Sequence, residues 1–416
     1  MTPASAKAIL TLSLMAPLAA MLGCGGGSSG SKTTSSSPSS STSNVQSITV
    51  NSGPAAAAPT NASYVNGAFT SVTVCVPGST GNCQTIGGIL IDTGSSGLRI
   101  LSSALTISPT QQTLNGSPVV ECLAFLDGIT WGPVQTVDMT IAGEQAKSLP
   151  IQVIGSSSFS TIPQSCSGQG ASEDTLPTLG ANGILGVGNF AQDCGTACTL
   201  SGSSNPGLYY TCPASGCAVT TESVSNQVQN PVTLFSTDNN GVIIELPSVS
   251  GAEASVSGSL IFGIGTQSNN GLGSATVYTI DPSTGNFTTV FNGTTYNDQS
   301  FIDSGSNALY FSNPSAVGIP ACSDNSGWYC PSSTLNLSAT NQGTNGSTGT
   351  VNFTVGNADV LFANANAAAI NGLAGPAFST DSGSFDWGLP FFYGRNVYTA
   401  IEGQSTPGGD GPYWAY

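Results

Sequence analysis

The sequence predicts a mostly β protein made of two similar lobes. Short runs of β-branched and aromatic residues alternate with Gly, Asn and Ser along most of the chain, a pattern typical of strands joined by turns. The composition agrees, because 53 residues are Gly and only 6% are charged. An apolar run that ends in Asp occurs twice, at Asp92 and Asp303. The chain beyond Val45, about 370 residues, is too long for a single core and favours two lobes.

The expected strands are distributed over both halves of the chain. The segments predicted to be strands are 64–76, 88–101, 137–141, 151–154, 242–246, 259–263, 288–291 and 301–311. Helix is scarce, with 358–369 and 396–401 as the predicted helical segments. The first of these is too short to span a membrane.

Charge and residue usage exclude several classes of chemistry. The chain has 21 Asp and Glu, 5 Lys and Arg and no His, which gives a formal net charge of −16 at pH 7. Without His, neither a Ser/His/Asp system nor a His-liganded metal site can form, and we expect no metal. So few basic residues cannot neutralise a row of phosphates, so we expect no nucleic-acid partner. Residues 186–191 fit a G-x-G-x-x-A pattern, but no βαβ unit surrounds them and we expect no cofactor.

The N-terminus has the features of an export signal. Lys7 precedes an apolar run over 8–22, which has the length of a signal-peptide core. The run ends in Met-Leu-Gly-Cys, which resembles the lipobox of bacterial lipoproteins, where the Cys carries the lipid. We therefore predict a signal peptide over 1–23, lipidation of Cys24 and a flexible linker over 24–45, with simple cleavage as the alternative. By the same resemblance, Gly25 indicates the outer membrane.

The remaining cysteines indicate an oxidising compartment. Apart from Cys24 there are ten, a number that fits five disulfides in a periplasm or exterior. Cys75 and Cys83, and likewise Cys322 and Cys330, are predicted to close local loops. Four others can pair in more than one way: Cys194, Cys198, Cys212 and Cys217.

Two acidic motifs carry the candidate chemistry. Residues 89–98 read ILIDTGSSGL and residues 300–309 read SFIDSGSNAL, so that an Asp ends each apolar run and a Gly turn follows. A buried carboxylate is costly unless something uses or satisfies it. Each motif alone is also an ordinary β-turn sequence, but two copies in the same setting favour a pair of carboxyl groups that share a proton. A third copy at Asp381 has no apolar strand before it and little chain after it, and we interpret it as a surface turn.

The spacing around the motifs supports an internal duplication. Phe69 precedes Asp92 by 23 residues, and Phe287 precedes Asp303 by 16. The difference of seven equals the number of residues between the cysteines of Cys75–Cys83, as expected for a loop inserted into one copy. Two lobes that each supply one carboxylate to a central cleft explain this spacing.

The motifs resemble those of pepsin-like aspartic proteases. The resemblance extends, in the family's order and spacing, to residues 182–188, 258–263 and 387–399. It covers roughly residues 60–402, and the two Asp motifs are its specific part. It implies a bilobal pepsin-like acid-protease fold, in which two pseudo-twofold-related β lobes, 46–225 and 226–416, enclose a central cleft.

The resemblance also implies the roles of the loop residues. Asp92 and Asp303 are expected to hold a water between them and to share one proton, so that one acts as general base and the other as acid. The supporting roles that the resemblance implies are cross-linking of the loops by Thr93 and Ser304, tight turns at Gly94 and Gly305, and hydrogen bonds to the outer carboxylate oxygens from Ser95 and Ser306.

The segment expected to form the flap over the cleft departs from the family pattern. Residues 125–132 read FLDGITWG where the family has Tyr-Gly-Thr-Gly, so Phe125 replaces the flap tyrosine. Arg99 stands where the family commonly has the tryptophan that pairs with the tyrosine hydroxyl. Trp131 either shields the cleft or packs into the core. We expect these residues, together with Asp127 and Gly128, to belong to the flap or the substrate cleft.

Two functions remain open. The leading one is an envelope-anchored aspartic endopeptidase, and the alternative is a non-catalytic peptide- or protein-binding lipoprotein on the same scaffold. The intact motifs at Asp92 and Asp303 favour the enzyme, whereas Phe125 and Arg99 favour the binder. In either case we expect a monomer that is exported to the bacterial envelope, is held at the outer membrane by its lipid and binds a peptide or protein.

Overall fold

The computed structural model describes residues 44–54, 64–312, 318–324, 326–377 and 383–416. The predicted signal peptide, Cys24 and Asp381 lie outside the described residues. Of the linker predicted over 24–45, two residues are described and both belong to the folded part, because Asn44 is buried and Val45 begins strand β1 (Val45–Asn51). The boundary predicted at residue 45 is therefore too late by two residues.

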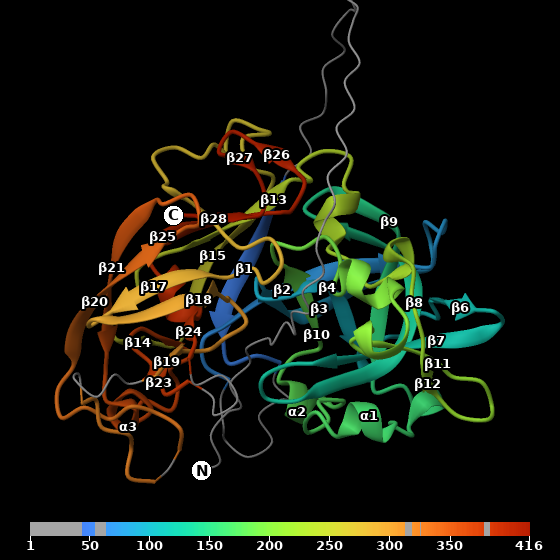
Figure 1. Ribbon diagram of the computed structural model, residues 1–416, viewed down its shortest axis with the longest axis horizontal. Helices are drawn as coiled ribbons and strands as arrows, with labels where there is room; N and C mark the ends of the chain where they lie inside the picture. Colours follow the sequence, from blue (N-terminus) through green and yellow to red (C-terminus); the bar gives the residue numbers. More distant parts are fainter. Residues whose placement is uncertain (1–43, 55–63, 313–317, 325, 378–382) are drawn as a thin grey trace, which may run out of the picture.

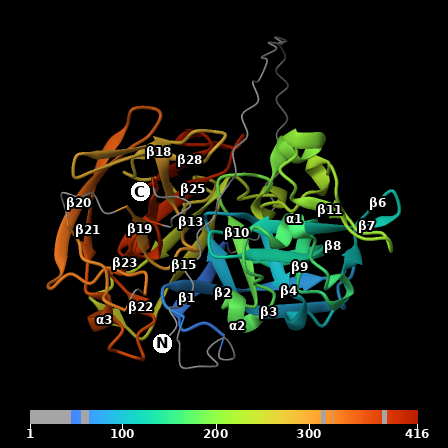
Figure 2. The same cartoon turned by 60° about the horizontal axis from the view of Figure 1, so that its bottom comes forward.

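Strands dominate both halves of the molecule, as the sequence predicts. Figure 1 shows the N-terminal half (cyan to green) and the C-terminal half (orange to red) side by side, and Figure 2 shows the same two lobes from another direction. The strands of the N-terminal lobe are β2 (Gly67–Cys75), β3 (Cys83–Asp92), β4 (Ser96–Leu101), β5 (Thr110–Gln111), β6 (Thr113–Leu114), β7 (Ser117–Ala124), β8 (Ile129–Ile141), β9 (Glu144–Ile154), β10 (Gly183–Val187), β11 (Tyr209–Thr211) and β12 (Ala218–Val219).

The C-terminal lobe contains a seven-stranded sheet in the order β21–β20–β17–β18–β24–β19–β23. Its strands are β17 (Phe287–Phe291), β18 (Thr294–Ile302), β19 (Leu309–Phe311), β20 (Leu335–Gln342), β21 (Thr348–Val355), β23 (Ala374–Gly375) and β24 (Phe385–Trp387). Two further sheets have two strands each: β14 (Ala252–Glu253) pairs with β22 (Ala369–Ile370), and β26 (Ser405–Thr406) pairs with β27 (Gly409–Asp410).

The helices of the described residues are all short. The α-helices are α1 (Gln164–Ser167), α2 (Leu176–Leu179) and α3 (Ala358–Leu361), and the 3₁₀ helices are η2 (Ser102–Ala104), η3 (Ser157–Phe159), η4 (Gly195–Thr199), η5 (Gly202–Ser204), η6 (Val224–Asn226), η7 (Pro231–Leu234) and η9 (Leu389–Phe392). Within the described ranges, no helix is long and apolar enough to cross a membrane.

A central sheet joins the two lobes. β1 pairs with β15 (Val256–Phe262), and the sheet continues through β13 (Gly241–Leu246), β25 (Arg395–Ala400), β28 (Tyr413–Ala415) and β16 (Val277–Thr279). β1 also pairs with β2 of the N-terminal lobe. Because β1 pairs with strands of both lobes, the sheet is continuous across the two lobes predicted to meet at residues 225/226.

The strand registers show the internal duplication. In the N-terminal lobe, β10 lies between the parallel β3 and the antiparallel β4, with Leu185 opposite both Ile91 and Leu98. In the C-terminal lobe, β24 lies between the parallel β18 and the antiparallel β19, with Trp387 opposite both Ile302 and Leu309. In each lobe the Asp loop connects the two outer strands of this three-stranded unit: β3 and β4 in the first lobe, β18 and β19 in the second. The Asp therefore follows the apolar strand at the equivalent position in both lobes.

The loop inserted into one copy is also present. β2 and β3 pair as far as Cys75 and Cys83, which are joined by a disulfide. The equivalent hairpin of β17 and β18 is closed by Asn292 and Gly293 alone, with φ of 49° and 81°. Positive φ at both central residues is the requirement of a two-residue hairpin turn, and Asn-Gly satisfies it.

Five disulfides account for the ten cysteines beyond Cys24. The predicted local bridges Cys75–Cys83 and Cys322–Cys330 are confirmed. The four cysteines with open pairing form Cys194–Cys198 and Cys212–Cys217, so two more small loops are closed. Cys122–Cys166 is the longest-range bridge and joins β7 to α1.

Both predicted helices are largely wrong. Over 358–369, only the first turn is helical, capped by the Asn357 side chain; the chain then turns at Asn364, and Ala369 pairs with β14. Residues 396–401 form most of β25, because β13 and β28 bond both of its edges and override the local preference. The segments predicted as single strands over 88–101 and 301–311 are each divided by an Asp loop.

Candidate active site

The first Asp loop follows directly from the apolar end of β3. The last four residues of this strand are buried because β2 and β10 pair with it on either side. Asp92 is 3% exposed, and both of its carboxylate oxygens accept hydrogen bonds: Oδ1 from the Gly94 N–H at 2.8 Å and Oδ2 from the Ser95 hydroxyl at 2.6 Å. The predicted role of Ser95 as a partner of the carboxylate agrees with this contact.

The second Asp loop repeats the arrangement after β18. Asp303 is fully buried, its Oδ1 accepts from the Gly305 N–H at 2.7 Å, and its Oδ2 accepts from the Ser306 hydroxyl at 2.9 Å. Asp-x-Gly-Ser therefore forms the same local structure twice, with the backbone N–H at the third position and the hydroxyl at the fourth orienting one carboxylate.

The two loops are bonded to each other by a reciprocal set of hydrogen bonds. The Thr93 hydroxyl accepts from the Ser304 N–H at 2.9 Å and donates to the Ile302 carbonyl at 3.2 Å. The Ser304 hydroxyl accepts from the Thr93 N–H at 3.1 Å and donates to the Ile91 carbonyl at 2.9 Å. The cross-linking predicted for these two side chains is present, and it fixes one loop relative to the other.

Each glycine of the loops lies against the carboxylate of the opposite lobe. A Cβ added to Gly94 would lie 2.8 Å from Asp303 Cγ, and one added to Gly305 would lie 2.9 Å from Asp92 Oδ1. Neither glycine has a positive φ, so the requirement is for space and not for backbone conformation. This contact also shows that the two carboxyl groups are close together.

The pair is electrostatically coupled. Burial raises the pKa of Asp303 well above its usual range, the negative charges of Asp92 and then Asp386 raise it further, and a hydrogen bond to the Asp92 carboxyl adds to the effect. The hydrogen bond from the Gly305 N–H opposes this shift. Two carboxyl groups in this arrangement share one proton over a range of pH.

The segment predicted as the flap lies in the hairpin of β7 and β8. Its turn is closed by a hydrogen bond of 2.7 Å from the Phe125 N–H to the Gly128 carbonyl. Phe125 is buried in an apolar cluster with Tyr64, Phe69 and Leu90, so its ring serves as core packing. Gly128 packs against the backbone of Ala171, where a Cβ would lie 2.6 Å from the carbonyl oxygen. The predicted flap segment thus lies in a turn.

Trp131 packs into the core. It is 2% exposed, its ring meets Tyr210 edge to face at 5.1 Å, and its indole N–H donates to the Phe159 carbonyl at 2.8 Å. Of the two alternatives for this residue, the structure supports packing into the core rather than shielding of the cleft.

Arg99 does not line the cleft, which corrects the prediction made for it. It is fully buried on β4, and its guanidinium donates to Glu121 at 2.7 Å, to Asp193 at 2.9 Å and to the Ser96 carbonyl at 2.8 Å. The Tyr209 hydroxyl completes the group by donating to Asp193 at 2.7 Å. Because Glu121 lies on β7, Arg99 links the flap to the strand that follows the first Asp loop.

The buried cluster of Arg99, Glu121 and Asp193 contains two carboxylates for one cation. Burial raises the pKa of Asp193 well above its usual range, and the charge of Glu121 and a hydrogen bond to it raise it further, while Arg99 and Tyr209 oppose the shift. A second pair of close, buried carboxyl groups therefore lies beside the Arg99 guanidinium.

Three residues near the site were missed by sequence reasoning. Asp386 is 1% exposed on β24 and contributes to the raised pKa of Asp303. The sequence contains a signal for it, because a single acid within the apolar run Phe-Asp-Trp indicates a buried carboxyl group. Glu121 shows the same pattern, a single acid within the buried apolar run of β7. Tyr64 lies beside Phe125, and nothing in its local sequence indicates this position.

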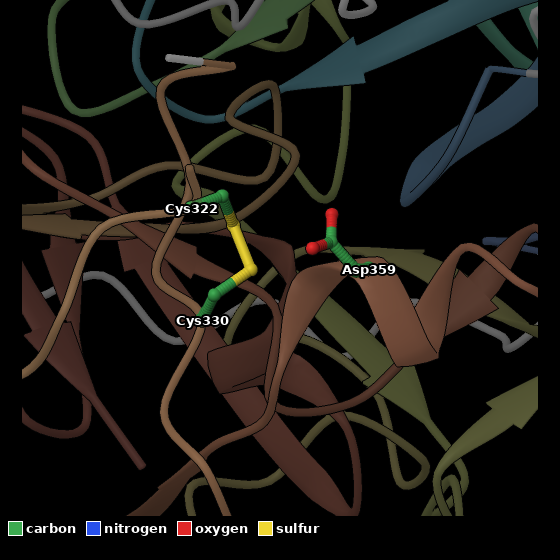
Figure 3. A group of neighbouring side chains, drawn as sticks. All are labelled: Cys322, Cys330 and Asp359. Carbon is green, nitrogen blue, oxygen red and sulfur yellow. A yellow bond between two sulfur atoms is a disulfide. The ribbon is translucent and has the colours of Figure 1, made fainter. Parts of the chain in front are cut away.

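One group in the described part of the chain brings together three potential metal ligands, Cys322, Cys330 and Asp359. Figure 3 shows the two cysteines joined through their sulfur atoms, with the Asp359 carboxylate beside them. Metals bind the thiolate form of Cys, which a disulfide does not offer. With this bond intact the group supplies a single carboxylate and does not fit a metal.

Comparison with known proteins agrees with the geometry. Among solved structures, the crystal structure of an aspartic proteinase from Irpex lacteus is similar to this chain with a TM-score of 0.53 and 16% sequence identity, over 89% of this chain and 96% of that one. At this identity, the likeness shows the fold, which is mostly β, bilobal and pepsin-like. No curated protein matches the chain. The model of a family described as "protein of unknown function (DUF3443)" matches residues 40–416, and the chain therefore belongs to the DUF3443 family.

Proposed function

We propose that the protein is an aspartic endopeptidase, which hydrolyses peptide bonds with a water activated between Asp92 and Asp303. The observation that carries the proposal is the reciprocal bonding of the two Asp loops, which brings one buried carboxyl group of each lobe against the other. An ordinary surface turn requires neither a cross-linked partner loop nor a second buried carboxylate.

The chemistry follows from the shared proton. Because the pKa of Asp303 is raised, we assign the proton to Asp303 and the role of general base to Asp92. Asp92 would take a proton from the water as its oxygen attacks the scissile carbonyl carbon. Asp303 would donate a hydrogen bond to the carbonyl oxygen and stabilise its negative charge. The C–N bond then breaks as Asp92 passes the proton it took from the water to the leaving nitrogen, which restores the ionised Asp92 and gives the carboxyl and amine products.

The remaining loop residues would hold the two carboxylates in position. Ser95 and Ser306 bond one oxygen of each carboxylate, and the N–H groups of Gly94 and Gly305 bond the other. These donors fix the planes of the carboxyl groups before a substrate binds, so that little reorganisation is required during the reaction.

The proposal is tested by incubating the full-length protein, purified in detergent, with a peptide library between pH 3 and 7, with and without a pepstatin-type inhibitor. We expect inhibitor-sensitive cleavage with a bell-shaped dependence on acidic pH, since the pair is active only between its two macroscopic pKa values. A folded protein that cleaves nothing, yet binds peptides, would support the non-catalytic binder instead.

We also propose that the protein is a lipoprotein of the bacterial envelope, held at the outer membrane through Cys24. The lipobox-like sequence and the five disulfides support this location. Cys24→Ala should move the protein from the membrane to the soluble envelope fraction. Unchanged membrane association of this variant would contradict the anchor.

A further inference from the structure

Phe125 leaves the flap without a hydroxyl, but Tyr64 contributes one from a different segment. Its ring is fixed between two glycines: a Cβ would lie 2.4 Å from Tyr64 Cε1 if added to Gly67, and 2.6 Å from Cε2 if added to Gly180. Phe69 meets the same ring edge to face at 5.4 Å. Tyr64 belongs to the apolar cluster that contains Phe125, the first residue of the predicted flap segment.

The Tyr64 hydroxyl is buried, in a residue that is 8% exposed, and it has no hydrogen-bond partner among the residues that the structure describes. Other buried tyrosines are satisfied: Tyr310 donates to Asn307 Oδ1 at 2.6 Å, and Tyr393 donates to Asn66 Oδ1 at 2.6 Å. Burying a hydroxyl without a partner lowers the stability of the folded protein. Such a group is therefore a candidate for a hydrogen bond to a bound ligand.

The segment that carries Tyr64 is attached to the second Asp loop. Asn66, two residues further along, is fully buried in the left-handed region with φ of 53°. Its side-chain amide donates to the carbonyl of Asn307, which directly follows Ser306, at 2.8 Å, and to that of Ile370 at 2.9 Å. The backbone near Tyr64 is therefore fixed relative to Asp303.

Several acidic groups act electrostatically on the hydroxyl. Burial raises the pKa of Tyr64 well above its usual range, and the carboxylates of Asp127 in the flap turn, of Glu173, and of Asp303 and Asp92 raise it further. The hydroxyl thus lies within the electrostatic influence of both the flap and the Asp pair. It also stays protonated at acidic and neutral pH and remains a hydrogen-bond donor.

We infer that the Tyr64 hydroxyl donates a hydrogen bond to a backbone carbonyl oxygen of a peptide bound between the flap and the Asp pair, and so supplies the donor that Phe125 lacks. The inference rests on the proposed function. It assigns a substrate-positioning role to a residue outside the flap, and it explains why the flap residue can be a phenylalanine that serves only for packing.

The test is Tyr64→Phe, which removes one oxygen atom and no hydrogen bond to any residue in the described ranges. The thermal midpoint should be unchanged or higher, whereas kcat/KM for a cleaved peptide should fall by about 3- to 10-fold, the factor expected for one neutral hydrogen bond. The affinity for a pepstatin-type inhibitor should fall by a similar factor. A role in stability alone would produce the opposite pattern.

Tyr296→Phe is the matched control. The Tyr296 hydroxyl donates to the Ser312 carbonyl at 2.7 Å within the C-terminal lobe, so its loss should lower the thermal midpoint and leave kcat/KM unchanged. A wild-type protein that cleaves peptides together with a Tyr64→Phe variant of equal kcat/KM and inhibitor affinity would overturn this inference alone. A wild-type protein that neither cleaves nor binds the inhibitor would overturn the proposed function, and this inference with it.

Discussion

The two Asp loops have the same backbone but different side chains behind them. Behind the first loop, β10 is entirely apolar, and Ile184 lies opposite Arg99 of β4. Behind the second, β24 places Asp386 at the equivalent register position, opposite Tyr310 of β19. The hydrogen bonds of the loops impose a symmetric geometry. The next layer of side chains breaks that symmetry, because the charge of Asp386 adds to the rise in the pKa of Asp303 that burial and the charge of Asp92 produce.

The charged groups of the two lobes also differ in their purpose. In the N-terminal lobe, Arg99 is engaged by Glu121 and Asp193, so the flap strand is held by a buried ion pair. In the C-terminal lobe, the buried Asp386 adds to the rise in the pKa of Asp303 that burial and Asp92 produce, whereas the Arg395 guanidinium packs on the ring of Phe391. The buried charges of the N-terminal lobe thus hold β7 against β4, whereas that of Asp386 in the C-terminal lobe changes the pKa of Asp303.

Removing either carboxylate should give the largest effect. Asp92→Asn and Asp303→Asn keep the shape of the side chain but abolish the shared proton, so kcat/KM should fall by about 10⁴-fold or more. Asp303→Asn should also raise stability near neutral pH, because the buried acid with a raised pKa is removed. Steady-state kinetics and thermal unfolding of both variants check this. Substantial cleavage by either would reject the pair as the catalytic groups.

Adding a methyl group to a loop should be the next most severe change. Gly305→Ala places a Cβ about 2.9 Å from Asp92 Oδ1, so the carboxylate must move. We expect a loss of about 10²-fold in kcat/KM and of about 1–3 kcal/mol in the free energy of unfolding. Gly81→Ala is the control, since nothing lies within 4 Å of its added Cβ. Equal activity of the two variants would show that the carboxylates are not packed as described.

The asymmetry itself is tested by Asp386→Asn. Because the charge of Asp386 raises the pKa of Asp303, its removal should lower that pKa and move the alkaline limb of the kcat/KM profile to lower pH. Asp410→Asn, at an exposed position of β27, should leave the profile in place. If the alkaline limb of Asp386→Asn coincides with that of the wild type, Asp386 does not tune the pair.

The smallest expected effect is on the pH dependence of stability. The pKa values of Asp303 and Asp193 are raised in the folded state, so the stability they contribute is fully present below their unfolded pKa of about 3.9 and is lost as the pH rises through the folded values. Each group contributes a slope of at most about 1.4 kcal/mol per pH unit. Thermal midpoints between pH 3 and 8 should therefore fall with increasing pH, and Asp193→Asn should flatten the curve. An unaltered slope in this variant would mean that Asp193 is ionised throughout.

The sequence predicts those parts of the site that depend on local structure. An apolar strand, an Asp, a Gly and a Ser are sufficient to specify the carboxylate and its two donors, and the duplication indicates that the two copies meet. Arg99 was misplaced because its position was taken from resemblance, whereas an acid at Glu121 inside a buried strand already demands a cation. Tyr64 and Asn66 could not be identified, since their roles depend on contacts with residues more than 100 positions away.

The position of β1 has a consequence for the order of folding. Val45 pairs with Ile261, so this strand waits for a partner 261 − 45 = 216 residues further along the chain. Asn66 likewise bonds Ile370, 304 residues away. Contacts of such high sequence separation slow folding, because a long loop must close before they form. The strand nearest the proposed anchor is thus left without part of its sheet until the second lobe has been synthesised. During that interval its open edge is available for pairing with other chains.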